Sequence, residues 1–139
     1  MKETRLPLLT THLKQLPEEP CMKESRIQSD VLRWLSLQPK QVFAWRQYTG
    51  PIVRGEKGQT FFTKNPCPGL PDIVVIIKGR FIGLEIKQPK GKQSPEQKSF
   101  EESISKAGGF YFIIRSLDDA IKAIESIKQL TEIDCGGNP

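Results

Sequence analysis

The sequence has 139 residues, the size of one ordinary domain, which excludes an enzyme with separate cofactor and substrate domains. Its 37% apolar and 27% charged residues are typical of a soluble globular chain. A lone histidine, His12, argues against a Ser–His–Asp triad, and the three cysteines are spaced too irregularly for a zinc cluster. No apolar run approaches a membrane span, and the first residues lack the apolar stretch of a signal peptide. We therefore expect a cytoplasmic protein with no membrane partner.

The net charge of +5 is concentrated in the middle of the chain. In residues 40–98 basic side chains far outnumber acidic ones, whereas the chain from Phe100 onward is net acidic. Lysine and arginine displace counterions from a phosphate backbone, so this segment is suited to a nucleic-acid binder. A solvated surface that keeps the protein soluble explains the same surplus equally well. Charge alone leaves both interpretations open.

The first half of the chain contains fewer regular elements than the second. Residues 1–21 carry three prolines and no sustained period, which predicts an N-terminal arm. Residues 24–37 place apolar side chains at helical spacing, and residues 42–48 are aromatic and β-branched, typical of a strand. The basic, Gly-rich stretch at 50–69 is too long for an ordinary connection, and a short extra strand is expected at 60–63.

Two clear strands follow, at residues 73–77 and 81–86, and the few residues between them predict a β-hairpin. Ser94 is then a predicted N-cap, with Pro95 at the first helical position and Gln97 at the capping-box position. This helix is expected to end at Gly108-Gly109.

Residues 110–114 form a fourth predicted strand, and Ser116 precedes a last amphipathic helix, which buries Ile121, Ile124, Ile127 and Leu130. The fold class is therefore α/β, with the order α-β-β-β-α-β, a mixed sheet flanked by helices, and an extra C-terminal helix. We expect a single domain at residues 22–131 and a flexible tail at 132–139.

The predicted hairpin brings two carboxylates together. A two-residue turn that pairs Ile77 with Arg80 places Asp72 opposite Glu85, and a three-residue turn leaves the two acids adjacent or diagonal. Like charges side by side are unfavourable without a cation, and oxygen ligands favour Mg²⁺ or Mn²⁺. Lys87 shares the face of Glu85 and is placed to polarise water or to offset charge on a phosphate. The alternative is an ordinary solvated ion cluster.

Other polar residues are expected near this pair. Glu24 and Gln28 lie one helical turn apart on the face that packs on the sheet, where Glu24 would complete the acidic shell and Gln28 would hydrogen bond. The alternative is that this first turn stays solvated. Gln97 needs no functional role if it serves only as a capping residue. Lysines for phosphate contact follow the second acidic strand: Lys87, Lys90, Lys92 and Lys98.

Several segments occur in an ordered series that resembles a known family. They are Gly69-Leu-Pro-Asp72, Glu85-Ile-Lys87, the Lys-Gly-Lys-Gln-Ser-Pro-Glu-Gln run that ends at Gln97, and Ala-Gly-Gly109. Together with the Glu-Ser-Arg-Ile-Gln helix, the Ala-Trp-Arg strand and the Arg-Ser-Leu-Asp-Asp segment, they resemble the PD-(D/E)xK nuclease superfamily, and within it the VRR-NUC domain. The similarity covers nearly all of residues 22–130. The long basic loop and the N-terminal arm are not part of it.

The resemblance implies a restriction-endonuclease-like core and hydrolysis of DNA phosphodiester bonds that depends on Mg²⁺ or Mn²⁺. It implies Asp72 and Glu85 as metal-binding acids, the backbone carbonyl of Ile86 as a further ligand, and Lys87 as the catalytic lysine. Glu24 would be the acid on the helix, also a candidate metal ligand, and Gln97 the family's trailing glutamine.

Relatives that consist of this domain alone resemble phage or bacterial proteins, some of them dimeric and active on branched DNA such as Holliday junctions. We therefore expect a homodimer that acts in a bacterial or phage-infected cell and needs no organic cofactor. The expected DNA contacts are basic residues of the middle segment: Arg46, Arg54, Lys57, Lys64, Lys90, Lys92 and Lys98.

Two other functional classes compete with a nuclease. A catalytically inactive DNA-binding module with a nuclease-like fold is the main alternative, although all of the expected acids and the lysine are present. A structural or regulatory protein that binds a partner through its apolar strands is the third.

Overall fold

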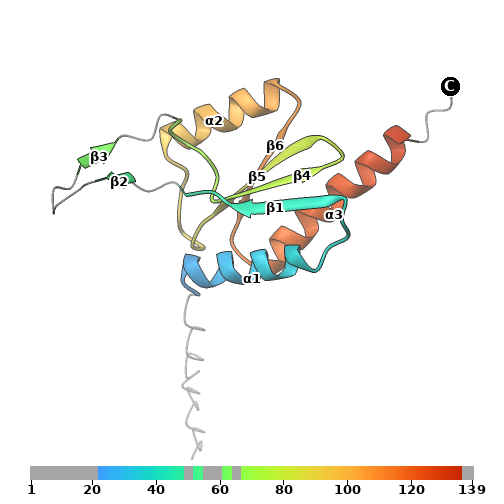
Figure 1. Cartoon of the computed structure of the whole chain (residues 1–139), viewed down its shortest axis with the longest axis horizontal. Helices are drawn as coiled ribbons and strands as arrows, with labels where there is room; N and C mark the ends of the chain where they lie inside the picture. Colours follow the sequence, from blue (N-terminus) through green and yellow to red (C-terminus); the bar gives the residue numbers. More distant parts are fainter. Residues whose placement is uncertain (1–21, 49–51, 55–60, 64–66, 136–139) are drawn as a thin grey trace, which may run out of the picture.

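The computed structural model describes most of the expected domain (Figure 1). The described residues are 22–48, 52–54, 61–63 and 67–135, and only the backbone is described for 52–54, 61–63 and 134–135. The expected arm at 1–21 and the last four residues of the expected tail lie outside them.

A four-stranded mixed sheet forms the centre of the fold, with the strand order β1-β4-β5-β6 (Figure 1). The strands are β1 (Val42–Arg46), β4 (Ile73–Ile77), β5 (Arg80–Ile86) and β6 (Phe110–Ile114). β4 pairs antiparallel with both β1 and β5, whereas β5 and β6 are parallel. A parallel pair needs a crossover connection, and helix α2 (Pro95–Lys106) supplies it. The predicted fold class and element order are confirmed.

Two helices cover one face of the sheet and the third covers the other (Figure 1). α1 (Glu24–Ser36) and α3 (Leu117–Cys135) pack on the sheet face that carries Ile73, Val75 and Ile77 of β4. α2 packs on the opposite face, near β6. Alternation along a strand separates the two faces. The buried core on the α1 and α3 side contains Ile27, Val31, Leu35, Ile73, Val75, Ile77, Ile82, Leu84, Ile86, Ile114, Ala120, Ala123, Ile124 and Ile127.

The last helix differs from the prediction in two ways. Leu130 was expected in its buried face but is exposed, because the buried stripe of α3 runs through Ile124, Ile127 and Thr131, about a quarter turn away. The helix also continues to Cys135, so the expected domain end at residue 131 falls inside it. Thr131 is buried, and its carbonyl accepts a hydrogen bond from Lys78 Nζ at 3.4 Å, which keeps this turn packed on the domain.

The long connection contains a separate two-stranded antiparallel sheet. β3 (Phe61–Thr63) confirms the expected extra strand, and β2 (Ile52–Arg54), which was not predicted, pairs with it. The β-branched pair Ile52-Val53 was the available signal, but it directly follows a Gly-Pro dipeptide and is too short to show a strand period.

The hairpin between β4 and β5 has the predicted two-residue turn. Lys78 and Gly79 have φ angles of 48° and 78°, which both lie in the left-handed region required by a type I′ turn. Ile77 consequently pairs with Arg80, and Ile73 pairs with Leu84 at the other end. The predicted register is therefore confirmed, and one further step along it places Asp72 opposite Glu85.

None of the helices in the described part of the chain is long and apolar enough to cross a membrane.

Candidate active site

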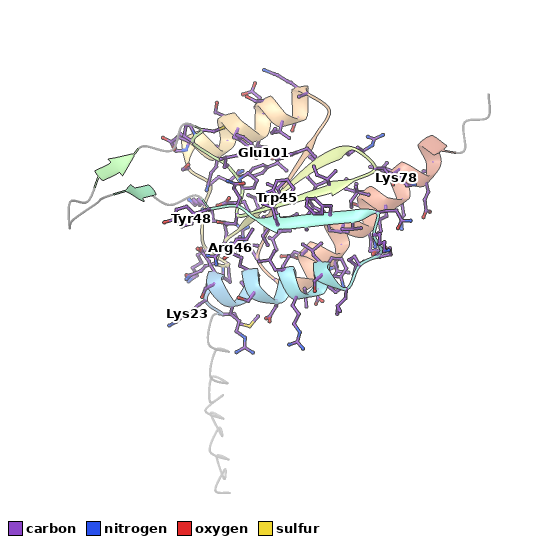
Figure 2. All side chains as sticks on the ribbon, viewed as in Figure 1. Lys23, Trp45, Arg46, Tyr48, Lys78 and Glu101 are labelled. Atoms are coloured by element: carbon purple, nitrogen blue, oxygen red, sulfur yellow. The ribbon has the colours of Figure 1, made fainter. Side chains whose placement is uncertain are left out.

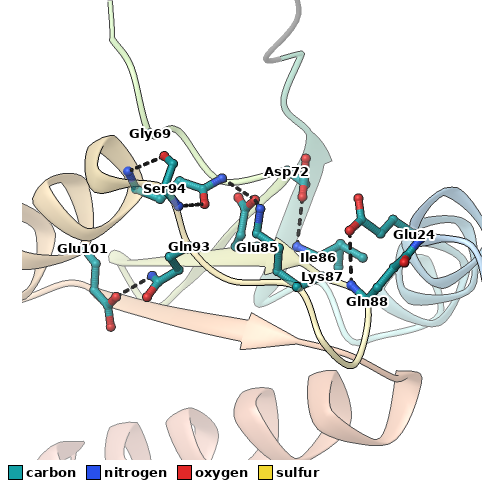
Figure 3. A network of polar contacts seen from close by, with 12 residues as sticks. Glu24, Gly69, Asp72, Glu85, Ile86, Lys87, Gln88, Gln93, Ser94 and Glu101 are labelled. Carbon is teal, nitrogen blue, oxygen red and sulfur yellow. Dashed lines mark hydrogen bonds and ion pairs between the residues drawn. The ribbon is translucent and has the colours of Figure 1, made fainter.

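The two predicted acids meet at one end of the sheet, on the face that α2 covers (Figure 3). Asp72 directly precedes β4, and its Oδ2 accepts a hydrogen bond from the backbone N–H of Ile86 at 2.9 Å. Glu85 is on β5 and is only 4% exposed. The backbone of β5 therefore orients the Asp72 carboxylate, and the Glu85 side chain of the same strand supplies the second carboxylate. The proposed ligand role of the Ile86 carbonyl stays a prediction.

Three side chains donate to the Glu85 carboxylate. Lys87 Nζ lies 3.2 Å from Oε1, and Gln97 Nε2 donates to the same oxygen at 2.6 Å. The Tyr111 hydroxyl donates to Oε2 at 3.3 Å. Buried carboxylates need such donors, and together they leave Glu85 little freedom to reorient.

Gln97 serves the helix and the site together. Its backbone N–H donates to Ser94 Oγ at 3.2 Å, and its side-chain Oε1 accepts from the Ser94 N–H at 2.9 Å, which completes the predicted capping box. The amide nitrogen of the same side chain donates to Glu85. The capping box holds the Gln97 side-chain amide in place, so that its oxygen contacts Ser94 while its nitrogen contacts Glu85. The capping interpretation of Gln97 is confirmed, and its functional role stays a prediction that the contact with Glu85 supports.

Tyr111 is a site residue that the sequence did not reveal. It lies on β6 beside Gly83, and a Cβ at Gly83 would come within 3.0 Å of the tyrosine ring and 2.9 Å of Pro71. Glycine at position 83 therefore leaves room for the Tyr111 ring, whose hydroxyl reaches Glu85. A glycine inside a strand signals such a close approach, and this was the available clue. Burial and the neighbouring Glu85 carboxylate raise the pKa of the Tyr111 hydroxyl, which therefore stays protonated and donates.

Helix α1 contributes Glu24 at the edge of the site (Figure 3). Its Oε1 accepts a hydrogen bond from the backbone N–H of Gln88 at 3.1 Å, so it holds the start of the loop after β5. Glu24 is exposed, but its charge contributes to raising the pKa of Asp72. Gln28, one helical turn further along, is only 8% exposed. The alternative that this turn stays solvated is therefore wrong for Gln28.

Both acids are less acidic than usual. Burial raises the pKa of the Asp72 carboxyl, against the lowering effects of the Ile86 hydrogen bond and the Lys87 charge. Burial also raises the pKa of Glu85, and the negative charge of Asp72 raises it further. The two carboxylates thus repel each other in a poorly solvated place, and a cation would relieve the repulsion.

The donor set fits a hard divalent cation. Asp72 and Glu85 offer carboxylate oxygens only, which suit Mg²⁺ or Mn²⁺, and Mg²⁺ commonly takes one or two carboxylates with waters and phosphate. Within the described residues, no three His, Cys, Asp or Glu side chains come together as a complete metal cage. Such a site would need ligands from solvent and substrate.

A pocket of about 340 Å³ opens beside these acids. Asp72, Glu85 and Gln97 line it together with the backbone turn at Gly69. Gly69 has a φ of +86°, and a Cβ there would lie 2.3 Å from the Glu96 carbonyl oxygen. Only glycine allows the chain to pass this close to the start of α2 in this conformation, so this residue sets the shape of the pocket wall.

The loop between β5 and α2 is held from several sides. Arg115, which was not predicted, donates from Nε to the Pro89 carbonyl at 3.2 Å and from Nη2 to the Gly91 carbonyl at 2.8 Å. Gln93 Nε2 donates to Glu101 at 2.6 Å (Figure 3). These contacts fix the path of the loop from outside the local sequence.

Four of the seven predicted DNA contacts have described side chains. Arg46 ends β1 opposite Ile73, on the sheet face away from Asp72, and its charge lowers the pKa of Asp72 from there. Lys90, Lys92 and Lys98 are exposed on the loop and the first turn of α2. The backbone of Arg54 is in β2. Lys57 and Lys64 lie outside the described residues.

The fold resembles that of a solved structure described as "VRR_NUC domain". The two share 21% sequence identity with a TM-score of 0.50, and the match covers 73% of this chain and 94% of the other. No protein-family model and no curated protein matches the sequence. At this identity the match establishes the fold alone. The chain thus has the α/β fold of a VRR_NUC domain, as expected from the sequence motifs.

Proposed function

We propose that the protein is a metal-dependent endonuclease that hydrolyses DNA phosphodiester bonds, with a preference for branched DNA such as Holliday junctions. The observation that supports it most directly is the convergence of Asp72, Glu85 and Lys87 beside an open pocket. Carboxylates with raised pKa values next to a lysine are typical of a site that uses a cation and a phosphate. The nuclease-type fold of the chain is consistent with this function.

Asp72 and Glu85 would hold Mg²⁺ or Mn²⁺, with the Ile86 carbonyl and Glu24 as further candidate ligands. When bound, the ion would supply an activated water and neutralise charge on the phosphate. Lys87, at 3.2 Å from Glu85, would orient the attacking water and stabilise the negative charge that develops on the phosphoryl oxygens. Gln97 and Tyr111 keep the Glu85 carboxylate in one orientation while this happens.

The basic residues around the site would bind the DNA backbone on both sides of the scissile bond. We propose Arg46, Lys90, Lys92 and Lys98, whose side chains are exposed, together with Arg54, Lys57 and Lys64 from the sequence. Cleavage of a symmetric junction needs two active sites, which a homodimer would supply. A DNA substrate of this kind would place the activity in the cytoplasm of a bacterial or phage-infected cell.

The direct test is cleavage of labelled four-way, flapped and linear duplex DNA in Mg²⁺ or Mn²⁺. We expect metal-dependent nicking of the branched substrates that EDTA and the Asp72→Asn variant abolish. Asp118→Asn, which neutralises an exposed carboxylate on α3, is the matched control and should cleave like the wild type. Equal residual activity in wild type and Asp72→Asn would remove the proposal.

A further inference from the structure

The sheet face that carries the acids continues beyond them onto β1. Trp45 pairs with Val74, and the Gln47 N–H donates to the Asp72 carbonyl at 2.8 Å, which extends the same register by one step. Residues directly opposite one another share a face, so Gln47 lies next to Asp72. Alternation then puts Phe43 and Trp45 on this face as well. The three side chains form a row that starts at the active site and runs along β1.

No helix in the described part of the chain covers this row. Helix α2 packs over β5 and β6, where Phe100 lies 6.0 Å from Tyr111 and 6.4 Å from Phe81 between ring centroids. On β1, by contrast, Phe43 is 65% exposed and Trp45 is 38% exposed. Trp45 is labelled on the ribbon in Figure 2. Two large aromatic side chains are therefore presented to solvent along β1, with Trp45 two residues and Phe43 four residues from Gln47.

The two rings are held in a fixed arrangement. Their centroids are 5.6 Å apart with an interplanar angle of 44°. The indole N–H of Trp45 donates to Gln47 Oε1 at 3.2 Å. This hydrogen bond directs the N–H edge of the indole toward Gln47, the residue opposite Asp72. Each side chain keeps part of its surface exposed to solvent.

The surroundings of this row favour nucleic acid as its occupant. From Leu37 to Gly55 the sequence contains no acidic residue, and Lys40 is exposed just before β1. Aromatic side chains in a basic setting stack on bases regardless of sequence, because every base has a π-face. In a duplex those faces are hidden in the helical stack, so only unpaired nucleotides can use such a row.

We propose that Phe43 and Trp45 form a stacking platform for unpaired DNA bases next to the scissile phosphate. This inference rests on the proposed nuclease function for the position of the phosphate. The platform makes the substrate class more specific: DNA with unpaired nucleotides at or beside the cleavage point, as in a flap, an open junction or a single strand.

Intrinsic fluorescence tests the platform without any cleavage. Trp34 and Trp45 are the two tryptophans of the chain, so a Trp34→Phe variant with an unchanged melting profile makes Trp45 the reporter. In EDTA, an oligo(dT) strand should quench this fluorescence, whereas an abasic strand of the same length and charge should leave it unchanged. A 2-aminopurine strand gives the reverse readout with wild-type protein. Equal quenching by the abasic strand would mean phosphate binding alone and would overturn the proposal.

Variants then test its contribution to affinity. Phe43→Ala and Trp45→Ala should each weaken oligo(dT) binding at least about fivefold and leave duplex binding unchanged, as expected when a base stack is lost. Leu130→Ala, which truncates an exposed apolar residue on α3, is the control and should bind both DNAs like the wild type. Equal losses on both DNAs would contradict base stacking.

Sedimentation of the same variants tests a second copy of the chain as the occupant. If Trp45→Ala disrupts a dimer and leaves oligo(dT) affinity intact, the aromatic row is a dimer contact and the platform is wrong. The platform and the nuclease can also fail separately. Base-dependent quenching without cleavage would support the stacking platform and overturn the nuclease function. Cleavage without base-dependent quenching would support the nuclease function and overturn the platform.

Discussion

Among the residues that hold the Glu85 carboxylate, Tyr111 is the most deeply buried. Its hydroxyl is 3.3 Å from Glu85 Oε2 and 3.4 Å from the Gly69 carbonyl oxygen, so its single proton has two acceptors within reach. Tyr111 thus acts on the site through Glu85 and is a positioning residue.

Tyr111→Phe should weaken metal binding and leave the fold intact. The ring would keep its contact with Phe100, whereas the Glu85 carboxylate would lose a donor. Loss of a group that orients a metal ligand typically lowers metal affinity about 10-fold or more. Titration calorimetry with Mn²⁺ measures the change, and the melting temperature checks the fold. An unchanged affinity would mean that Lys87 and Gln97 hold Glu85 sufficiently by themselves.

Asp72→Asn should stabilise the metal-free protein at neutral pH. The pKa of Asp72 is raised in the folded state, so its contribution to stability is complete below the unfolded value of 3.8 and is lost as the pH rises through the folded value. Asparagine stays neutral and its carbonyl can still accept from Ile86 N–H. We expect a gain of roughly 0.5 to 2 kcal/mol in the free energy of unfolding at pH 7, which disappears near pH 3.

Urea unfolding in EDTA between pH 3 and 8 measures this difference. Asp118→Asn serves again as the control for removal of a negative charge. A stability difference that grows as the pH falls would have the wrong sign and would contradict the environment assigned to Asp72.

At the scale of elements, the N-terminus of α2 joins the helix to the site. Ser94→Ala removes the acceptor of the Gln97 N–H and should cost about 1 kcal/mol of stability, with the Gln97 donor to Glu85 retained. Gln97→Ala should lose similar stability and also about 10-fold in Mn²⁺ affinity. Thermal unfolding and calorimetry on both variants separate the two roles. Equal metal affinities in the two variants would assign Gln97 to capping alone.

Gly69 determines how closely the chain before β4 approaches α2. Gly79 provides a matched comparison, because its φ of +78° is similar but a Cβ there would meet no atom within 4 Å. Gly79→Ala should therefore cost only the backbone strain, about 1 kcal/mol. Gly69→Ala adds a collision with the Glu96 carbonyl and should cost clearly more, together with a loss of cleavage as α2 shifts. Equal losses in urea unfolding would show that the contact relaxes freely.

For the whole molecule, cation binding and folding should be coupled. If the ion binds the two acids only in the folded state, Mn²⁺ at 100 times its Kd should add about 2.7 kcal/mol to the free energy of unfolding. Asp72→Asn should abolish this gain, since it removes one of the two carboxylates. Thermal unfolding with and without Mn²⁺ measures both. A similar gain in Asp72→Asn would locate the ion elsewhere.

The proposed homodimer also belongs to this scale. Sedimentation velocity at micromolar concentration should give a mass of two chains, and junction cleavage should then nick opposing strands in pairs. A monomer that cleaves one strand at a time would contradict the dimer and leave the metal-dependent chemistry standing.

Much of this protein was predictable from the sequence because the deciding interactions are local. The turn between β4 and β5 is short, and either turn length that the sequence allowed leaves Asp72 beside Glu85, as the two-residue turn in the structure does. The cap of α2 is likewise encoded within four residues, Ser94 to Gln97. Alternation along β5 then determines which side Lys87 shares with Glu85.

Only the tertiary structure decided which distant residues complete the site. β5 and β6 are parallel and joined through a helix, so no turn sets their register, and the position of Tyr111 beside Gly83 depends on packing in the finished sheet. For the same reason Arg115 could not be assigned to the loop that it holds. The exposure of Trp45 depends on where α2 lies across the sheet. Local sequence determined the pair of acids, and long-range packing determined the groups that orient them and the surface beside them.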